Sequence, residues 1–236
     1  MVAHGVRRPT STDFARRVHA SPTEGGRLQL GVELAVELLG GCDHASVTML
    51  TPHFVETVAA SDAVVRRGDD WQYELSEGPC LDTVRNQATV VSQDLGQDGR
   101  WRSWCPRAVD ELGVHAMMSV LLSVSTGVVG SLNLYADRVQ VWDDEQQTFA
   151  RTLADQLAVA VAEARLLDER ERALLRRTGI GQAQGIVMER FGLRADQAFD
   201  LLQRLSESTQ VELVHLAEHI VDTRQLPPAG RASPST

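Results

Sequence analysis

The feature that most constrains the fold is a long stretch of helical periodicity in the second half of the chain. After Asp143, a plausible N-cap, a seam repeats at alternating steps of four and three residues: Leu153, Leu157, Ala160, Ala164, Leu167, Glu171 and Leu174. The spacing predicts a helix over 143–178, about 50 Å long. Its first half should cover a sheet, and its second half should pair in a parallel homodimeric coiled coil. A monomer whose helix folds back on its own domain is the alternative.

The chain before this helix predicts an α+β domain. Period-two alternation predicts strands at 45–50, 55–60 and 89–92, and a hairpin made of 117–124 and 128–135. Helical patterns predict helices at 25–39, 63–73 and 104–112, with a short helix after Gly78-Pro79. These elements make an antiparallel sheet flanked by helices.

Two further amphipathic helices follow Gly181, at 195–206 and 211–222. With the end of the long helix they predict an all-α three-helix bundle. The expected organisation is a disordered N-terminus with a short helix (1–20), the α+β domain (21–163), the bundle (164–226) and a disordered tail (227–236).

Composition excludes several classes of protein. No apolar run is long enough to cross a bilayer and no signal peptide opens the chain, so we expect a cytoplasmic protein without membrane contact. The three cysteines have neither disulfide nor zinc spacing, and no metal site is expected. The net charge of −9 argues against bulk attraction to nucleic acid, so any such contact needs a local basic patch. Asp82, His115 and Asp137 form no nucleophile–base grouping, so we expect no enzyme.

A candidate basic patch lies on the long helix. On an unbroken helix, four arginines fall within about 40° of Ala183: Arg165, Arg172, Arg176 and Arg190. Arginines around small residues would let a nucleic-acid backbone come close, and guanidinium planes can stack on unpaired bases. The alternative is a solvated face whose arginines pair with Asp168, Glu169 and Glu171, with the small residues serving helix packing.

The segment 177–190 closely resembles the signature of ANTAR domains, the RNA-binding modules of bacterial transcription antitermination regulators. The match spans 166–221 and rests on Arg177, Ile180, Ala183, Gly185, Met188, Ala198, Phe199, Leu202, Leu216, Ala217 and Glu218. The resemblance and the basic patch together imply that RNA binds through Arg172, Arg176, Arg177, Gln182, Ala183, Gln184, Gly185 and Arg190. The family usually has lysine where this chain has Gln184, a change that would remove one phosphate contact.

Residues 41–164 resemble a GAF domain, a small-molecule sensor fold. The resemblance rests on the segments 41–45, 77–82, 100–101 and 130–135. It implies a small-molecule ligand between the sheet and the helix of Cys80, and the pocket candidates are Cys80, Leu81, Cys105 and His115. Cys80 follows a turn at a helix start, which can make a thiol reactive, but a packing cysteine is the default. No cofactor can be assigned, because the histidines lack metal-binding spacing.

Together, the two resemblances imply a signal-responsive regulator that binds paired RNA hairpins in nascent transcripts and acts by transcription antitermination. Two hairpins suit the two modules of a homodimer. The alternative is a dimeric sensor whose helical module makes protein–protein contacts without binding RNA, which the acidic net charge and Gln184 would favour.

Overall fold

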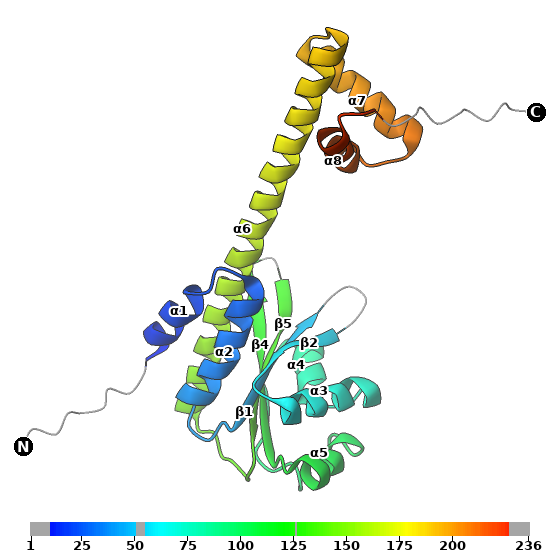
Figure 1. Cartoon of the computed structure of the whole chain (residues 1–236). Helices are drawn as coiled ribbons and strands as arrows, with labels where there is room; N and C mark the ends of the chain where they lie inside the picture. Colours follow the sequence, from blue (N-terminus) through cyan, green and yellow to red (C-terminus); the bar gives the residue numbers. More distant parts are fainter. Residues whose placement is uncertain (1–9, 51–54, 126, 227–236) are drawn as a thin grey trace, which may run out of the picture. The chain divides into compact units, whose positions relative to one another are not determined.

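The computed structural model describes residues 10–50, 55–125 and 127–226 (Figure 1). The chain divides between Arg165 and Leu166 into two compact units, called here the N-terminal and C-terminal units. The expected disordered ends at 1–9 and 227–236 lie outside the described residues, as does His53, one of the histidines considered above as metal ligands.

The N-terminal unit is built on a five-stranded antiparallel sheet. Its strands are β1 (His44–Leu50), β2 (Val55–Ala60), β3 (Val90–Ser92), β4 (Ala116–Val124) and β5 (Gly127–Ala136). Their order across the sheet is β2-β1-β5-β4-β3. The α+β prediction is confirmed, including the hairpin of β4 and β5, in which Ala116 is paired with Ala136.

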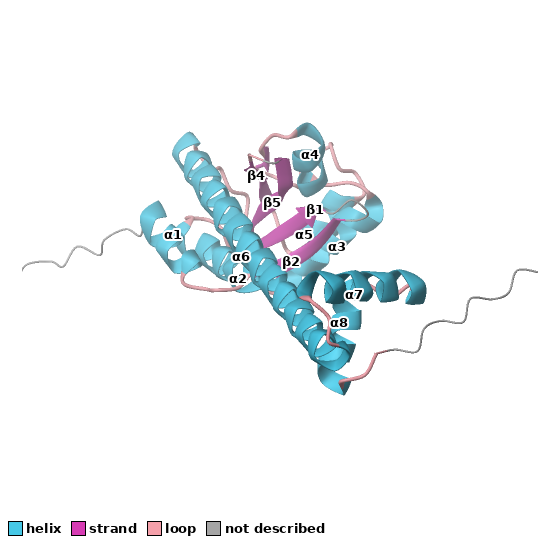
Figure 2. Ribbon diagram, turned by 90° about the horizontal axis from the view of Figure 1, so that it is seen from above, coloured by secondary structure: helices cyan, strands magenta, loops and turns pink. Residues whose placement is uncertain are grey.

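Helices cover both faces of this sheet (Figures 1 and 2). One face packs against α2 (Glu24–Leu38) and the beginning of α6 (Asp144–Phe191), and α1 (Ser11–His19) packs on α2. Buried Arg27 ties α2 to α6, because its guanidinium donates to the carbonyl of Ala160 at 2.6 Å. The other face lies under α3 (Ala63–Leu75), α4 (Pro79–Asn86) and α5 (Trp104–Leu112).

The two faces of the sheet differ in polarity because strand side chains alternate. On β1, Ala45, Val47 and Met49 belong to the apolar cluster with α2 and α6. The intervening Ser46 and Thr48 are fully buried on the other side. The same alternation places Leu132 and Leu134 in the apolar cluster, while other residues of β5 face α3 and α4.

His44 ties β1 to two carboxylates from distant segments. Its Nδ1 lies 2.6 Å from Oδ2 of Asp62, the N-cap of α3, and its Nε2 lies 2.9 Å from Oδ1 of Asp137. Both ring nitrogens can donate only when the imidazole is protonated. Burial lowers the pKa of His44, but the hydrogen bonds to Asp62 and Asp137 outweigh burial and raise it above its ordinary value.

The stability of the N-terminal unit should therefore depend on this histidine. A group whose pKa rises on folding stabilises the fold below its unfolded pKa, and that contribution is lost as pH rises through the folded pKa. We expect the free energy of unfolding to fall by roughly 1–2 kcal/mol above the folded pKa, because one charged hydrogen bond is lost. His44→Gln should lack this decline.

The measurement is denaturant unfolding followed by tryptophan fluorescence at several pH values from about 6 to 9. All four tryptophans, Trp71, Trp101, Trp104 and Trp142, belong to the N-terminal unit, so the signal reports that unit alone. His215→Gln, in the C-terminal unit, is the control. A wild-type profile as flat as that of His44→Gln would contradict the prediction.

Helix α6 is longer than the sequence predicts, because it continues through Gly179 and Gly181 to Phe191. Each glycine costs a helix about 1 kcal/mol relative to alanine. Burial of Ala183 and Val187 on the same helix offsets that cost. The helix ends at Gly192, whose φ of +62° is the left-handed conformation that glycine favours.

The two parts of the heptad seam lie in different environments. Leu153, Leu157, Ala160 and Ala164 are buried in the N-terminal unit, as predicted. Leu167 and Leu174 are 55% and 65% exposed, so no described part of the chain covers them. The leucine seam, as we call Leu167 and Leu174 together, is the surface that the coiled-coil prediction assigns to a second copy.

The C-terminal unit is a three-helix bundle made of the end of α6, α7 (Ala195–Thr209) and α8 (Leu213–Thr223). Its core consists of Ala183, Val187, Ala198, Leu202, Leu216, Ala217 and Ile220. The small residues Ala183, Ala198 and Ala217 come from three different helices, which allows the helices to pack closely.

Candidate nucleic-acid interface and sensor core

The motif residues on α6 point to opposite sides of the helix. Ala183 has no exposed surface and packs in the core of the bundle. Gly185 is exposed, and a Cβ built on it would meet no atom within 4 Å. Ala183 therefore holds the bundle together in this structure, while Gly185 leaves open space above the helix.

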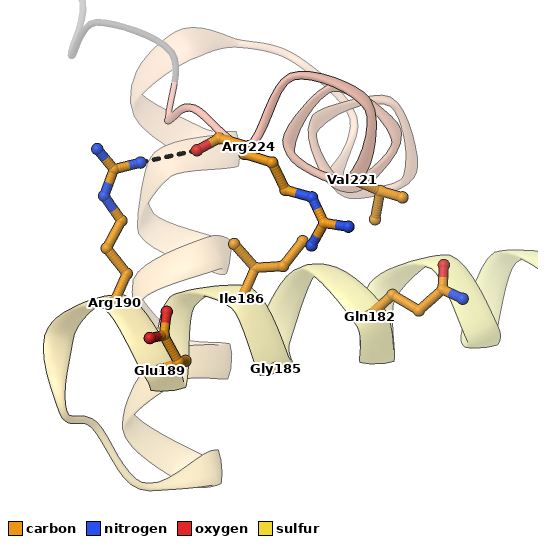
Figure 3. Close-up of a pocket in the computed structure, with 7 residues that line it drawn as sticks. All are labelled: Gln182, Gly185, Ile186, Glu189, Arg190, Val221 and Arg224. Carbon is orange, nitrogen blue, oxygen red and sulfur yellow. Dashed lines mark hydrogen bonds between the residues drawn. The ribbon is translucent and has the colours of Figure 1, made fainter.

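A groove runs beside this open face, between α6 and the end of α8 (Figure 3). It has a volume of about 770 Å³ and is lined by Gln182, Gly185, Ile186, Glu189, Arg190, Val221 and Arg224. We call it the Arg224 groove. Three of the sequence candidates meet here: Gln182, Gly185 and Arg190. The guanidinium of Arg190 donates to the backbone carbonyl of Arg224 at 2.7 Å.

The other sequence candidates lie elsewhere in the unit. Arg172 pairs with Asp168 at 2.8 Å. Arg172 and Arg176 line a second groove beside Glu212, the N-cap of α8, and His215 and Glu218 of that helix. Arg177 is exposed. The amide of Gln184 donates to the carbonyl of Ala195 at 2.6 Å. Position 184 thus joins α6 to the start of α7 in this chain.

Sequence reasoning did not single out Arg224. It follows the last residue of α8 and lies outside every motif that the sequence analysis used. The signal that could have found it is its place at a helix C-terminus, where basic side chains are favoured.

In the N-terminal unit, buried polar side chains form a network between the sheet and helices α3 and α4. This polar core consists of Ser46, Thr48, Asp69, Gln72, Ser119, Ser131 and Asn133. The amide of Asn133 donates to Thr48 at 2.9 Å and accepts from Ser119 at 2.8 Å.

Asp69 is the ionisable group of the polar core, and it has no exposed surface. Its carboxylate accepts from the hydroxyl of Thr57 at 2.8 Å and from the hydroxyl of Tyr135. Burial raises the pKa of Asp69 to about 6, although hydrogen bonds from Ser46, Tyr135 and Thr57 act in the opposite direction. The carboxyl is therefore poised to change its protonation state near neutral pH when its surroundings change.

The sensor-pocket candidates are only partly brought together. Cys80 lies against the polar core, with its thiol 3.3 Å from the Thr48 hydroxyl, and Cys105 packs in the same apolar cluster as Trp104. Leu81 is nearly buried on α4. His115 is half-buried just before β4, and it is not among the buried residues of that cluster.

The environment of the two cysteines favours packing over reactivity. Burial raises the pKa of Cys80 to about 11 and that of Cys105 to about 11. A reactive cysteine needs a lowered pKa, so the position of Cys80 at a helix start does not activate it in this structure. Within the described ranges, no group of three or more His, Cys, Asp or Glu side chains is placed so that it could hold a metal ion. No helix in the described part of the chain has the length and apolarity that a membrane span requires.

Comparison with known protein families assigns each of the two units to a domain family. The GAF domain family matches residues 23–162, and the ANTAR domain family matches residues 168–221. The chain belongs to the GAF–ANTAR regulators. ANTAR is an RNA-binding antitermination domain and GAF is a sensor domain, so the GAF–ANTAR chain is a signal-responsive regulator built from regulatory domains.

Solved structures resemble the GAF unit in fold. The GAF domain of a phosphoenolpyruvate-protein phosphotransferase from Coxiella burnetii is 18% identical, with a TM-score of 0.54, covering 67% of this chain and 94% of that chain. Free methionine-R-sulfoxide reductase from Neisseria meningitidis, in complex with its substrate, is 12% identical, with a TM-score of 0.55, covering 68% and 90%. At these identities the likeness shows the fold alone. A comparison with curated proteins found no match.

Proposed function

We propose that this GAF–ANTAR protein binds paired RNA hairpins in nascent transcripts and acts by transcription antitermination in response to a signal at its GAF domain. The observation that carries the proposal is the ANTAR bundle itself, which presents exposed arginines in a chain of net charge −9. Arg176 and Arg177 are exposed on α6, and no ion pair involving either is found among the described residues. Such cations are free to neutralise RNA phosphates.

A homodimer is the second part of the proposal. The leucine seam exposes two large apolar side chains along one helix, and a parallel coiled coil would bury them. Each copy then supplies one ANTAR domain, so that one dimer can engage two hairpins of the same RNA. Binding two sites on one molecule raises the overall affinity well above that of each site.

The signal should act on α6 through the polar core. We infer that a small-molecule ligand binds between the sheet and α3 and α4, where the polar core supplies hydrogen-bonding groups. Helix α6 contributes buried residues to both the GAF core and the ANTAR core. A ligand that favours one packing of α6 in the GAF domain would therefore change the state of the same helix in the ANTAR domain.

The experiment is a mobility-shift titration of the full-length protein against a two-hairpin RNA and a scrambled RNA at two salt concentrations. We expect Arg176→Ala/Arg177→Ala to lower the affinity by about 10- to 100-fold, because two charged contacts are lost. The matched control is Arg66→Ala/Arg67→Ala, an adjacent exposed pair on α3 of the GAF domain.

Hairpin-dependent binding by the wild type supports RNA recognition, and an in vitro termination assay then tests antitermination. Wild-type affinity in Arg176→Ala/Arg177→Ala would show that these arginines do not contact RNA. If the wild-type protein binds neither RNA, with the GAF domain in any redox or ligand state, the RNA proposal fails. The alternative, a module for protein–protein contacts, would then stand.

A further inference from the structure

Arg224 combines two features that its neighbours lack. It lies three residues beyond the end of the ANTAR match, at the C-cap of α8, with a φ of +59°. Arginine adopts this left-handed conformation less readily than glycine or asparagine, which commonly end helices there. Its side chain lines the Arg224 groove together with Ile186 and Val221 (Figure 3).

Of the two arginines that line the groove, Arg190 is already held by a hydrogen bond. The C-terminal end of a helix carries partial negative charge on its free carbonyls. Arg190 donates to the carbonyl of Arg224 and so offsets part of that charge. No hydrogen bond or ion pair to the guanidinium of Arg224 is found among residues 10–50, 55–125 and 127–226. The Arg224 guanidinium is therefore available to a ligand.

The lining of the groove fits a nucleotide. Its two arginines outnumber the single carboxylate, Glu189, which suits one negative charge. Ile186 and Val221 offer an apolar surface for the face of a base, and Gln182 offers an amide for its edge. The exposed Gly185 adds no side chain that would keep a ribose or phosphate away.

We propose that the Arg224 groove holds one unpaired nucleotide of the RNA, with its phosphate on Arg224 and its base against Ile186 and Val221. The inference rests on the RNA-binding function proposed above and adds to it a contact residue outside the ANTAR match. A partner helix is a poorer occupant, because only two of the seven lining residues have apolar side chains.

The left-handed backbone at Arg224 permits a test that separates folding from binding. Arg224→Gly removes the guanidinium while supplying the residue that the backbone prefers, so the ANTAR unit should melt at the same temperature or higher. Its affinity for the two-hairpin RNA should fall roughly tenfold, and the slope of log affinity against log salt should become shallower by about one.

The matched control is Gln210→Gly. Gln210 occupies the equivalent left-handed C-cap of α7, with a φ of +55°, and does not line the groove. This variant loses the hydrogen bond from the Gln210 amide to the carbonyl of Glu207 at 2.9 Å, which offsets the gain from glycine, and its RNA affinity should be unchanged. Glu189→Gln, which removes the groove's negative charge, should tighten binding by about two- to threefold.

A second experiment tests whether a base contacts the groove. The same RNA is prepared with an abasic residue at each unpaired loop position in turn. One position should weaken binding to the wild type and have a smaller effect on Arg224→Gly, because without the phosphate contact the nucleotide is held less in the groove and its base contributes less.

The outcomes separate this inference from the function on which it rests. If the wild-type protein does not bind the RNA, the proposed function fails and this inference fails with it. If the wild type binds and Arg224→Gly keeps its affinity and salt slope, only the Arg224 groove is overturned. Equal losses in Arg224→Gly and Gln210→Gly would also overturn it, since the effect would then come from the helix ends.

Discussion

Replacing Leu167 and Leu174 together by glutamate is expected to convert the proposed dimer to a monomer. Each leucine is more than half exposed, so the substitution removes few contacts among the described residues of the chain itself. In a parallel coiled coil it would place charges at two core positions, where burying an unpaired charge is strongly unfavourable. The protein should therefore stay folded and lose its partner.

The same variant should bind a two-hairpin RNA about 100- to 1,000-fold more weakly than the wild type, because the two RNA-binding modules are no longer linked. Its affinity for a single hairpin should change little. Light scattering after size-exclusion chromatography gives the mass, and mobility-shift titrations of both RNAs give the affinities.

Val139→Glu/Val141→Glu is a matched control, because these residues are also exposed, at 54% and 64%, and lie outside the leucine seam. A wild-type protein that runs as a monomer at micromolar concentration would contradict the dimer proposal. A dimeric Leu167→Glu/Leu174→Glu variant would place the interface elsewhere.

The second large effect is expected at Ala183. Leucine at this position adds three carbons to a core that leaves Ala183 no exposed surface, and overpacking of this kind costs typically 1–3 kcal/mol or more. The bundle is small, so we expect Ala183→Leu to unfold it or to lower its melting temperature by about 10 °C or more. RNA binding should be lost with the fold.

Gly185→Leu makes a larger change two residues away and should leave the bundle folded, because its side chain would point into open space. Circular dichroism at 222 nm follows both units, and tryptophan fluorescence follows the GAF unit alone. Ala183→Leu melting like the wild type would contradict the packing described here. So would a Gly185→Leu protein as unstable as Ala183→Leu.

These two positions show how far the sequence could predict the site. A helical wheel gives the angle of each residue around α6, but it does not tell which angles α7 and α8 cover. Arg172, Arg176 and Ala183 share one stripe, yet only Ala183 lies where the other helices bury it. The stripe predicted as an RNA surface is therefore partly the inner face of the bundle.

Elements with strong local patterns were predicted well. The five strands, the hairpin and the three helices of the bundle follow from periodicity and turn residues. Local patterns could not predict contacts between distant segments. His44 meets Asp62 and Asp137 from separate parts of the chain, and Gln184 is held by Ala195 across a turn. Helix α6 continues through Gly179 and Gly181 because burial of its side chains in the bundle outweighs the low helix propensity of glycine.

The unequal faces of the GAF sheet have an evolutionary consequence. The apolar face joins the strands to α2 and α6, so the connection of the domain to the output helix depends on that side. The polar core on the opposite face consists of side chains that satisfy one another's hydrogen bonds. Substitutions there can exchange one hydrogen-bonding pattern for another without touching the apolar layer. Mutations on the polar side of the sheet could therefore change which stimulus the domain detects. The packing of α2 and α6 on the apolar side would be kept.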